Sequence, residues 1–268
     1  MESVIVDWIY NHPTWLWGNI LVWGAAAVAC LGLAVFHRFV HVDVRRAHND
    51  LAGFSIAIIS VVYAVLLAFI AVATWEAFAK ADTITQTEAG DIANLYRDTK
   101  GFPPDLGDRM RGELRRYLGL VINDEWPVQQ RGEVPEAGWA PLVRLHEDLV
   151  RFHPQTLGES VIEAEFLRSL NDLYKTRTAR LIAVRGHIPG VVWWIIAIGG
   201  GLTTGFTYLF GFHSFRLHLT MTAAVAASLA LVVVLIVALD WPYRGEVSIS
   251  SDAYIEVEQS LAESGGGK

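Results

Sequence analysis

The sequence has little of the chemistry on which disulfide-bonded proteins and most enzymes depend. Its 268 residues include a single cysteine, Cys30, which excludes an intrachain disulfide and any cysteine-based metal site. It lacks a Gly-x-Ser-x-Gly motif, a phosphate-binding glycine-rich loop and a cysteine nucleophile in a polar segment. The net charge of −7 disfavours non-specific binding to nucleic acid. We therefore expect no catalytic residues, no cofactor and no nucleic-acid partner.

Charge is also missing from four long apolar runs, at about residues 15–36, 52–74, 191–210 and 217–239. A helix rises about 1.5 Å per residue, so runs of this length can cross a hydrocarbon layer of about 30 Å. No charged side chain lies near the middle of a run, which argues against a proton relay or a charge-coupled transporter. Hydrophobic residues make up 53% of the chain, and no segment alternates as a β-strand does. The sequence predicts an all-α integral membrane protein with four transmembrane helices, in two pairs (2+2) that flank a helical extramembrane region.

This interpretation divides the chain into five segments. They are a lead-in at 1–14, transmembrane helices 1 and 2 at 15–75, the extramembrane region at 76–188, transmembrane helices 3 and 4 at 189–240, and a tail at 241–268. The opening residues lack the basic start of a signal peptide, so we expect the first run to be retained. In the extramembrane region, amphipathic periodicity predicts helices around Met110–Val121, 140–152 and 157–185.

The positive-inside rule gives opposite indications for the side on which the extramembrane region lies. Arginines fall in both short loops, yet four basic residues also directly precede the third run. These residues are Arg38, Arg45, Arg46 and Arg216 in the loops, and Lys175, Arg177, Arg180 and Arg185 before the run. The orientation therefore stays open.

The run at 52–74 continues to Asp82 without a glycine or proline, so one long helix should leave the membrane and enter a water-facing region. One face of this helix carries apolar residues at a spacing of four: Ile58, Val62, Leu66 and Ile70. In a ring of subunits such a stripe could line a narrow apolar pore. The stripe could equally face lipid or other helices, and a second stripe of Ile59, Tyr63 and Leu67 competes with it. Sequence alone does not choose the rotation of the helix.

Beyond the membrane the same helix becomes polar on most faces, as a helix does when it borders water or bridges between elements. Four of its residues could line a vestibule that favours cations: Glu76, Thr83, Thr87 and Glu88. The alternative is an ordinary solvated face with local salt bridges.

Two histidines, His37 and His41, stand four residues apart near Asp43 and His48, a spacing that can place two ligands on one helical face. No His-Glu-x-x-His pattern accompanies them, and basic and imidazole side chains at a membrane edge commonly extend toward lipid headgroups. We therefore predict no metal site.

A set of short motifs spread along the chain carries a resemblance to a known family. The residues concerned are Asn49, Asp50, Tyr63, Trp75, Glu125, Trp126, Pro127, Pro189, Asp240, Pro242 and Gly245. Their order and spacing, over roughly residues 15–258, resemble the bestrophin-like family of bacterial membrane proteins of unknown function.

The resemblance implies a multi-pass protein of the cell inner (plasma) membrane, distantly similar to the bestrophins, which are pentameric ion channels whose second span lines an apolar neck. It thus implies a homo-oligomer in the lipid bilayer that conducts small inorganic ions. Bestrophins have a run of acids after the fourth span that helps to clasp calcium, and this run is missing after Glu246, so calcium gating is not implied. The alternative is a non-conducting scaffold or sensor that binds a partner through its extramembrane helices. It predicts a groove on those helices and a second span packed inside one subunit.

Overall fold

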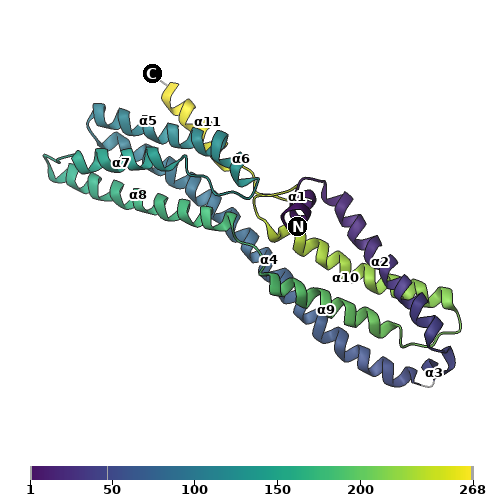
Figure 1. Ribbon diagram of the computed structural model, residues 1–268. Coiled ribbons are helices and arrows are strands. Elements are labelled where there is room, and N and C mark those ends of the chain that lie inside the picture. Colours follow the sequence, from purple (N-terminus) through teal and green to yellow (C-terminus); the bar gives the residue numbers. More distant parts are fainter. Residues whose placement is uncertain (1, 47, 267–268) are drawn as a thin grey trace. The chain divides into compact units, whose positions relative to one another are not determined.

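The computed structural model describes residues 2–46 and 48–266, and every regular element in them is a helix (Figure 1). The longer helices are α1 (Glu2–Tyr10), α2 (Thr14–Phe39), α4 (Asn49–Asp98), α5 (Pro104–Leu120), α7 (Trp139–Arg151), α8 (Leu157–Val184), α9 (Gly190–Thr207), α10 (Phe215–Asp240) and α11 (Asp252–Gly266). Short helical segments are α3 (Val42–Arg46), a 3₁₀ turn (Thr99–Gly101), a π turn (Val121–Glu125) and α6 (Trp126–Gln129). The prediction of an all-α chain is confirmed.

Four helices, α2, α4, α9 and α10, are long and apolar enough to cross a membrane. The bounds of α2, α9 and α10 lie within a few residues of the apolar runs, whereas α4 extends well beyond the end of its run, to Asp98. The longest, α4, is one unbroken helix of 50 residues, because no proline interrupts its ladder of hydrogen bonds. It contributes to two compact units.

The first unit consists of the residues up to Ala77, together with His187–Asp240 and Gly245–Val247. Within it α2 and α10 pack along each other (Figure 1). Small residues allow the close approach; a Cβ on Gly18, for example, would lie 3.3 Å from a methyl group of Val234. A second contact region joins α4, α9 and α10 through four buried side chains, Tyr63, Leu67, Ile196 and Ile236.

The second unit consists of Phe78–Gly186, Trp241–Arg244 and the residues from Ser248 onward. The amphipathic faces of α5, α7 and α8 enclose its core with the second half of α4 and with α11. Fully buried members of this core include Met110, Leu114, Leu145, Phe166 and Leu170. They lie at helical spacing because an apolar stripe of three to four residues per two turns faces the interior.

Three local features add to the helices predicted from the sequence. The lead-in forms α1 and the tail contains α11. Helix α5 continues without a break through the π turn into α6, which ends at Gln129. Pro127 lies in the first turn of α6, directly after this π turn.

Candidate functional site

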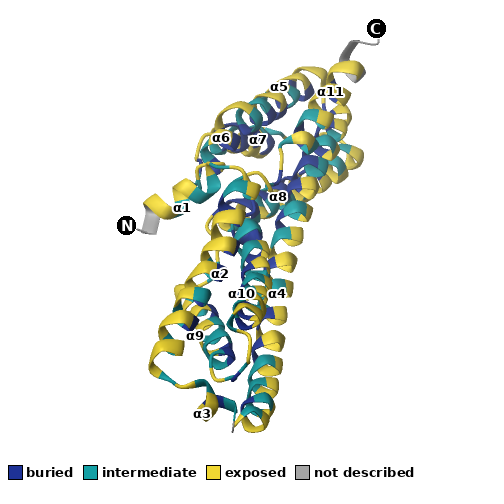
Figure 2. Cartoon of the chain, turned by 90° about the vertical axis from the view of Figure 1, so that its right-hand side faces the viewer, coloured by how far each residue is buried: buried dark blue, intermediate teal, exposed yellow. Residues whose placement is uncertain are grey.

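The exposed face of α4 is defined by how this helix packs within its own subunit. Tyr63 and Leu67 are 5% and 3% exposed, because they pack against α9 and α10. Ile58, Val62 and Leu66 are 53%, 66% and 37% exposed and face away from those helices. Figure 2 shows the same contrast along α4. Of the two competing stripes, the one with Tyr63 therefore faces inward and the one with Val62 faces outward.

The fourth member of the predicted pore stripe, Ile70, lies differently from the other three. It is partly buried and packs against the cluster that contains Tyr63 and Leu67. The outward stripe of a single subunit, which we call the outer stripe, thus consists of Ile58, Val62 and Leu66.

Tyr63 fixes the rotation of α4 with both its ring and its hydroxyl. The hydroxyl donates a hydrogen bond to the carbonyl oxygen of Ile196 at 2.7 Å. The ring occupies the space where a Cβ on Gly199 would lie, so this contact requires a glycine. The glycine run at 199–201 thus accommodates an aromatic ring from the neighbouring span.

The four residues predicted to line a vestibule separate in the structure. Glu76, Thr83 and Thr87 are exposed, and the two threonine hydroxyls bond to carbonyls of their own helix at 2.9 and 2.7 Å. Glu88 is 0% exposed, so within one subunit it does not border water, in contrast to the prediction. The physical reason is a pair of arginines on α8, which sequence inspection did not connect with it.

Glu88 belongs to a buried charge network with Glu125, Arg177 and Arg180, all of which are 0% exposed. Arg177 donates two hydrogen bonds to Glu125, with its Nη1 2.8 Å from Oε2 and its Nη2 2.6 Å from Oε1. Arg180 donates from Nε to Glu88 at 2.7 Å and from Nη2 to both Glu88 at 3.0 Å and Glu125 at 3.2 Å. Arg180 therefore bridges the two carboxylates, and the two acids balance the two bases.

Neutral groups also belong to the network, although Arg177 Nε and Arg180 Nη1 are buried without a hydrogen-bond partner. The Tyr117 hydroxyl donates to Glu88 and accepts from Arg177 Nη1 at 3.2 Å, while the Gly138 N–H donates to Glu125 at 2.7 Å. The Arg177 guanidinium lies 4.7 Å from the ring centre of Trp139, and that of Arg180 lies 6.0 Å from that of Trp126. Each charge thus has a partner of opposite sign and a polarisable neighbour.

The network changes the acidity of its members. Burial by itself would raise the pKa of Glu125, but the hydrogen bonds and charge of Arg177, together with Arg180, outweigh it and lower that pKa. Burial would likewise lower the pKa of Arg180, but Glu88 raises it well above its ordinary value. Burial raises the pKa of Tyr117, and it raises that of Tyr243 to about 12. Glu125, Arg177 and Arg180 are therefore charged, and Tyr117 and Tyr243 are neutral, near pH 7.

Sequence inspection treated Arg177 and Arg180 only as charges near a membrane edge. The signal that could have identified them is their register on α8. They lie on the same helical face as Phe166, Leu170 and Leu173, which are fully buried. A charge on an apolar stripe requires a buried partner of opposite sign.

The remaining motif residues mainly hold chain segments together. Asn49 accepts from the N–H of Gly211 at 2.8 Å and donates to its carbonyl at 3.2 Å. Asp240 accepts from the N–H of Ile188 at 2.7 Å, directly before Pro189 and α9. Gly245 has φ of 87°, a conformation that favours glycine.

Two further motif residues, Pro242 and Trp126, make contacts within the second unit, and three others lie on the surface. The Pro242 carbonyl accepts from Ile249 N–H at 2.9 Å, and the buried Trp126 ring packs edge-on against Tyr243 and Tyr254. Asp50, Trp75 and Pro127 are exposed.

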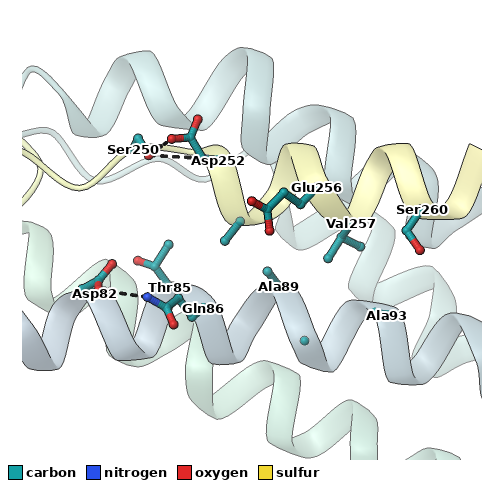
Figure 3. Close-up of a pocket in the computed structure, with 12 residues that line it drawn as sticks. Asp82, Thr85, Gln86, Ala89, Ala93, Ser250, Asp252, Glu256, Val257 and Ser260 are labelled. Atoms are coloured by element: carbon teal, nitrogen blue, oxygen red, sulfur yellow. Dashed lines mark hydrogen bonds between the residues drawn. The ribbon is translucent and has the colours of Figure 1, made fainter.

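A groove of about 520 Å³ runs between the extramembrane part of α4 and α11. Asp82 and Thr85 from α4 and Glu256 and Val257 from α11 line it from opposite sides (Figure 3). Gln86 donates to Asp82 at 2.9 Å, so part of this acidic lining is already paired. Within residues 2–46 and 48–266, no group of three or more potential metal-ligating side chains comes together.

The fold and these contacts define a class: an all-helical, four-span membrane protein with an outward-facing apolar second span and an enclosed extramembrane charge network. A model of the bestrophin-like domain matches residues 23–254. The chain therefore belongs to the bestrophin-like family.

Solved structures show the same fold at low sequence identity. A single-substitution variant of a bacterial bestrophin homologue from Klebsiella pneumoniae matches with a TM-score of 0.68 and 12% identity, covering 91% of this chain and 99% of its own. A second variant of that homologue matches with a TM-score of 0.66 and 12% identity, covering 92% and 97%. A variant described only as a membrane protein matches with a TM-score of 0.67 and 11% identity, covering 91% and 98%. No curated protein sequence matches this chain.

Proposed function

We propose that the chain is one subunit of an oligomeric ion channel in which α4 lines the pore. The observation that carries the proposal is the outer stripe. Its three apolar residues turn away from α9 and α10, while Tyr63 and Leu67 hold the helix in that rotation. In a closed ring, such stripes would form an apolar constriction, which gates conduction by excluding water. Membership of the bestrophin-like family supports the same conclusion.

Two adjacent valines on α4 provide a matched test. Val61 and Val62 are 63% and 66% exposed but point about 100° apart around the helix. Threonine has nearly the same shape as valine and adds a hydroxyl that wets a constriction. We expect Val62→Thr to raise ion flux into proteoliposomes severalfold, because polar groups at the neck lower the cost of hydration.

Val61→Thr is the control and should leave flux within experimental scatter of the parent. Vesicles without protein set the background. An absence of flux above that background in the parent and in both variants would refute the channel. An effect of Val61→Thr alone would refute the assignment of the outer stripe to the pore.

The rival function, a scaffold or sensor, is favoured by one observation, the acidic groove between α4 and α11. Its lining by Asp82, Asp252 and Glu256 would suit a basic partner segment. The rival also needs the second span to be packed inside one subunit, and the exposure of the outer stripe weighs against that requirement.

A further inference from the structure

A second cavity, of about 360 Å³, lies in the first unit, where α2 and α9 end and α4 begins. Its lining is almost entirely apolar and includes Phe36, Val40, Leu51, Phe206 and Leu209. Leu51 and Leu209 are 66% and 39% exposed, so the cavity is open on a face of the spans. Such a site suits a hydrocarbon chain.

One charged side chain among the lining residues is nearly inaccessible. Arg45, on α3, is 4% exposed. Its Nη1 donates to the carbonyls of Tyr208 and Phe210 at 3.2 and 3.3 Å, and its Nη2 bonds to Nδ1 of His37. These hydrogen bonds hold the guanidinium group of Arg45 in a fixed position.

Arg45 nevertheless lacks a full counter-charge. Within the described part of the chain, no carboxylate lies within ion-pair distance of it, and its buried Nε has no hydrogen-bond partner. The carbonyls at the end of α9 supply only about half a negative charge. The Nε of its neighbour Arg46 is likewise without a partner, but Arg46 has a counter-charge, because it pairs with Asp43 at 3.6 Å, and its side chain is 33% exposed. A buried cation without a counter-ion is costly, and near a membrane it marks a functional site.

We propose that this cavity binds one anionic phospholipid, with the lipid phosphate facing Arg45 and an acyl chain along Leu51, Phe206 and Leu209. The phosphate supplies the missing counter-charge, and the apolar lining supplies the chain contact. The last turn of α2 and the first turn of α10 also carry Arg38 and Arg216, which attract an anionic leaflet. The lipid site does not depend on ion conduction.

Native mass spectrometry of the detergent-purified protein, titrated with phosphatidylglycerol or phosphatidylcholine, tests the site. We expect the parent to retain phosphatidylglycerol in preference to phosphatidylcholine. Arg45→Gln should weaken that retention about tenfold, because it removes a charge-assisted contact. Arg46→Gln removes the same charge one residue away and should change retention less than twofold, as judged from the same titration.

Arg45 also caps α9, so Arg45→Gln could act through misfolding. Ser55→Phe avoids this difficulty, because Ser55 lines the cavity and the change leaves the contacts of Arg45 intact. It should abolish selective retention while leaving the melting temperature within a few degrees of the parent. Equal retention of the two lipids by the parent, equal losses in both arginine variants, or unchanged retention in Ser55→Phe would each overturn the proposal. So would competition by palmitate or inorganic phosphate as effective as that of phosphatidylglycerol.

Discussion

At the scale of single residues, the stability of the extramembrane unit depends on how Arg177 and Glu125 are paired. Two hydrogen bonds join them in a space where both are 0% exposed. Removing one partner of a buried pair leaves an unpaired charge in a medium that cannot solvate it. On the same helix, Arg168 pairs with Glu165 in water, where the side chains are 69% and 58% exposed. The buried arginine–glutamate pair should therefore contribute far more to stability than the exposed pair does.

Arg177→Met should destabilise the protein by about 3–5 kcal/mol, whereas Arg168→Met should cost about 0–1 kcal/mol. Chemical unfolding in detergent, followed by the fluorescence of the tryptophans, measures both. Adding Glu125→Leu to Arg177→Met should cost less than the sum of the two single changes, because it removes the stranded carboxylate. Equal losses for the two arginine variants would show that the pair at Arg177 has no special role.

Sequence could not reveal this pairing because the partners are far apart along the chain. Arg177 and Glu125 are separated by 52 positions, and Arg180 and Glu88 by 92. In the sequence, Glu88 is indistinguishable from the other polar residues of α4. Only its contact with α8 in the structure shows that it is enclosed. Hydrophobic periodicity identifies the apolar face of each helix, but it does not show which helices pack against each other.

At the scale of elements, the contact between α4 and α9 depends on the size of one residue. Gly199 faces the Tyr63 ring, whereas a Cβ on Gly201 would meet nothing within 4 Å. The spans themselves were predictable because length and apolarity suffice to recognise them. The rotation of α4 was not predictable, because both of its stripes are apolar. Only the fit of Tyr63 against Gly199 shows which stripe faces inward.

Gly199→Ala should cost about 1–3 kcal/mol, because its methyl group overlaps the Tyr63 ring. Gly201→Ala should be neutral or stabilising by up to about 1 kcal/mol, since alanine favours a helix over glycine. Thermal unfolding of the purified variants in one detergent distinguishes them. Tyr63→Leu should relieve the defect of Gly199→Ala; a defect that persists in this double variant would contradict the steric explanation.

At the scale of the whole molecule, one chain leaves most of its apolar spans uncovered. The most apolar stretch is 11% buried within the chain for α4 and 28% for α10. Lipid or further copies of the chain must cover this surface. Family membership and the helical fold could be predicted from motif order and hydropathy. The number of subunits could not, because it depends on how the surfaces of neighbouring subunits fit together.

We expect nanodisc-embedded protein to form a single species of three or more copies of the 29.7 kDa chain, because a closed ring around an axis needs more than two subunits. Mass photometry measures this directly, with empty nanodiscs as the reference mass. A monomer or a two-fold dimer would contradict both the ring and the proposed pore.

The buried charge network sums to zero, with two carboxylates against two guanidinium groups. Because its net charge is zero, the electric field of such a cluster falls off within a short distance in water. The electrostatic potential that the extramembrane helices present to their surroundings therefore comes from charged groups outside this network. Glu88 is absent from that set and Glu76 belongs to it, so any charge preference along α4 is carried by side chains that salt can screen.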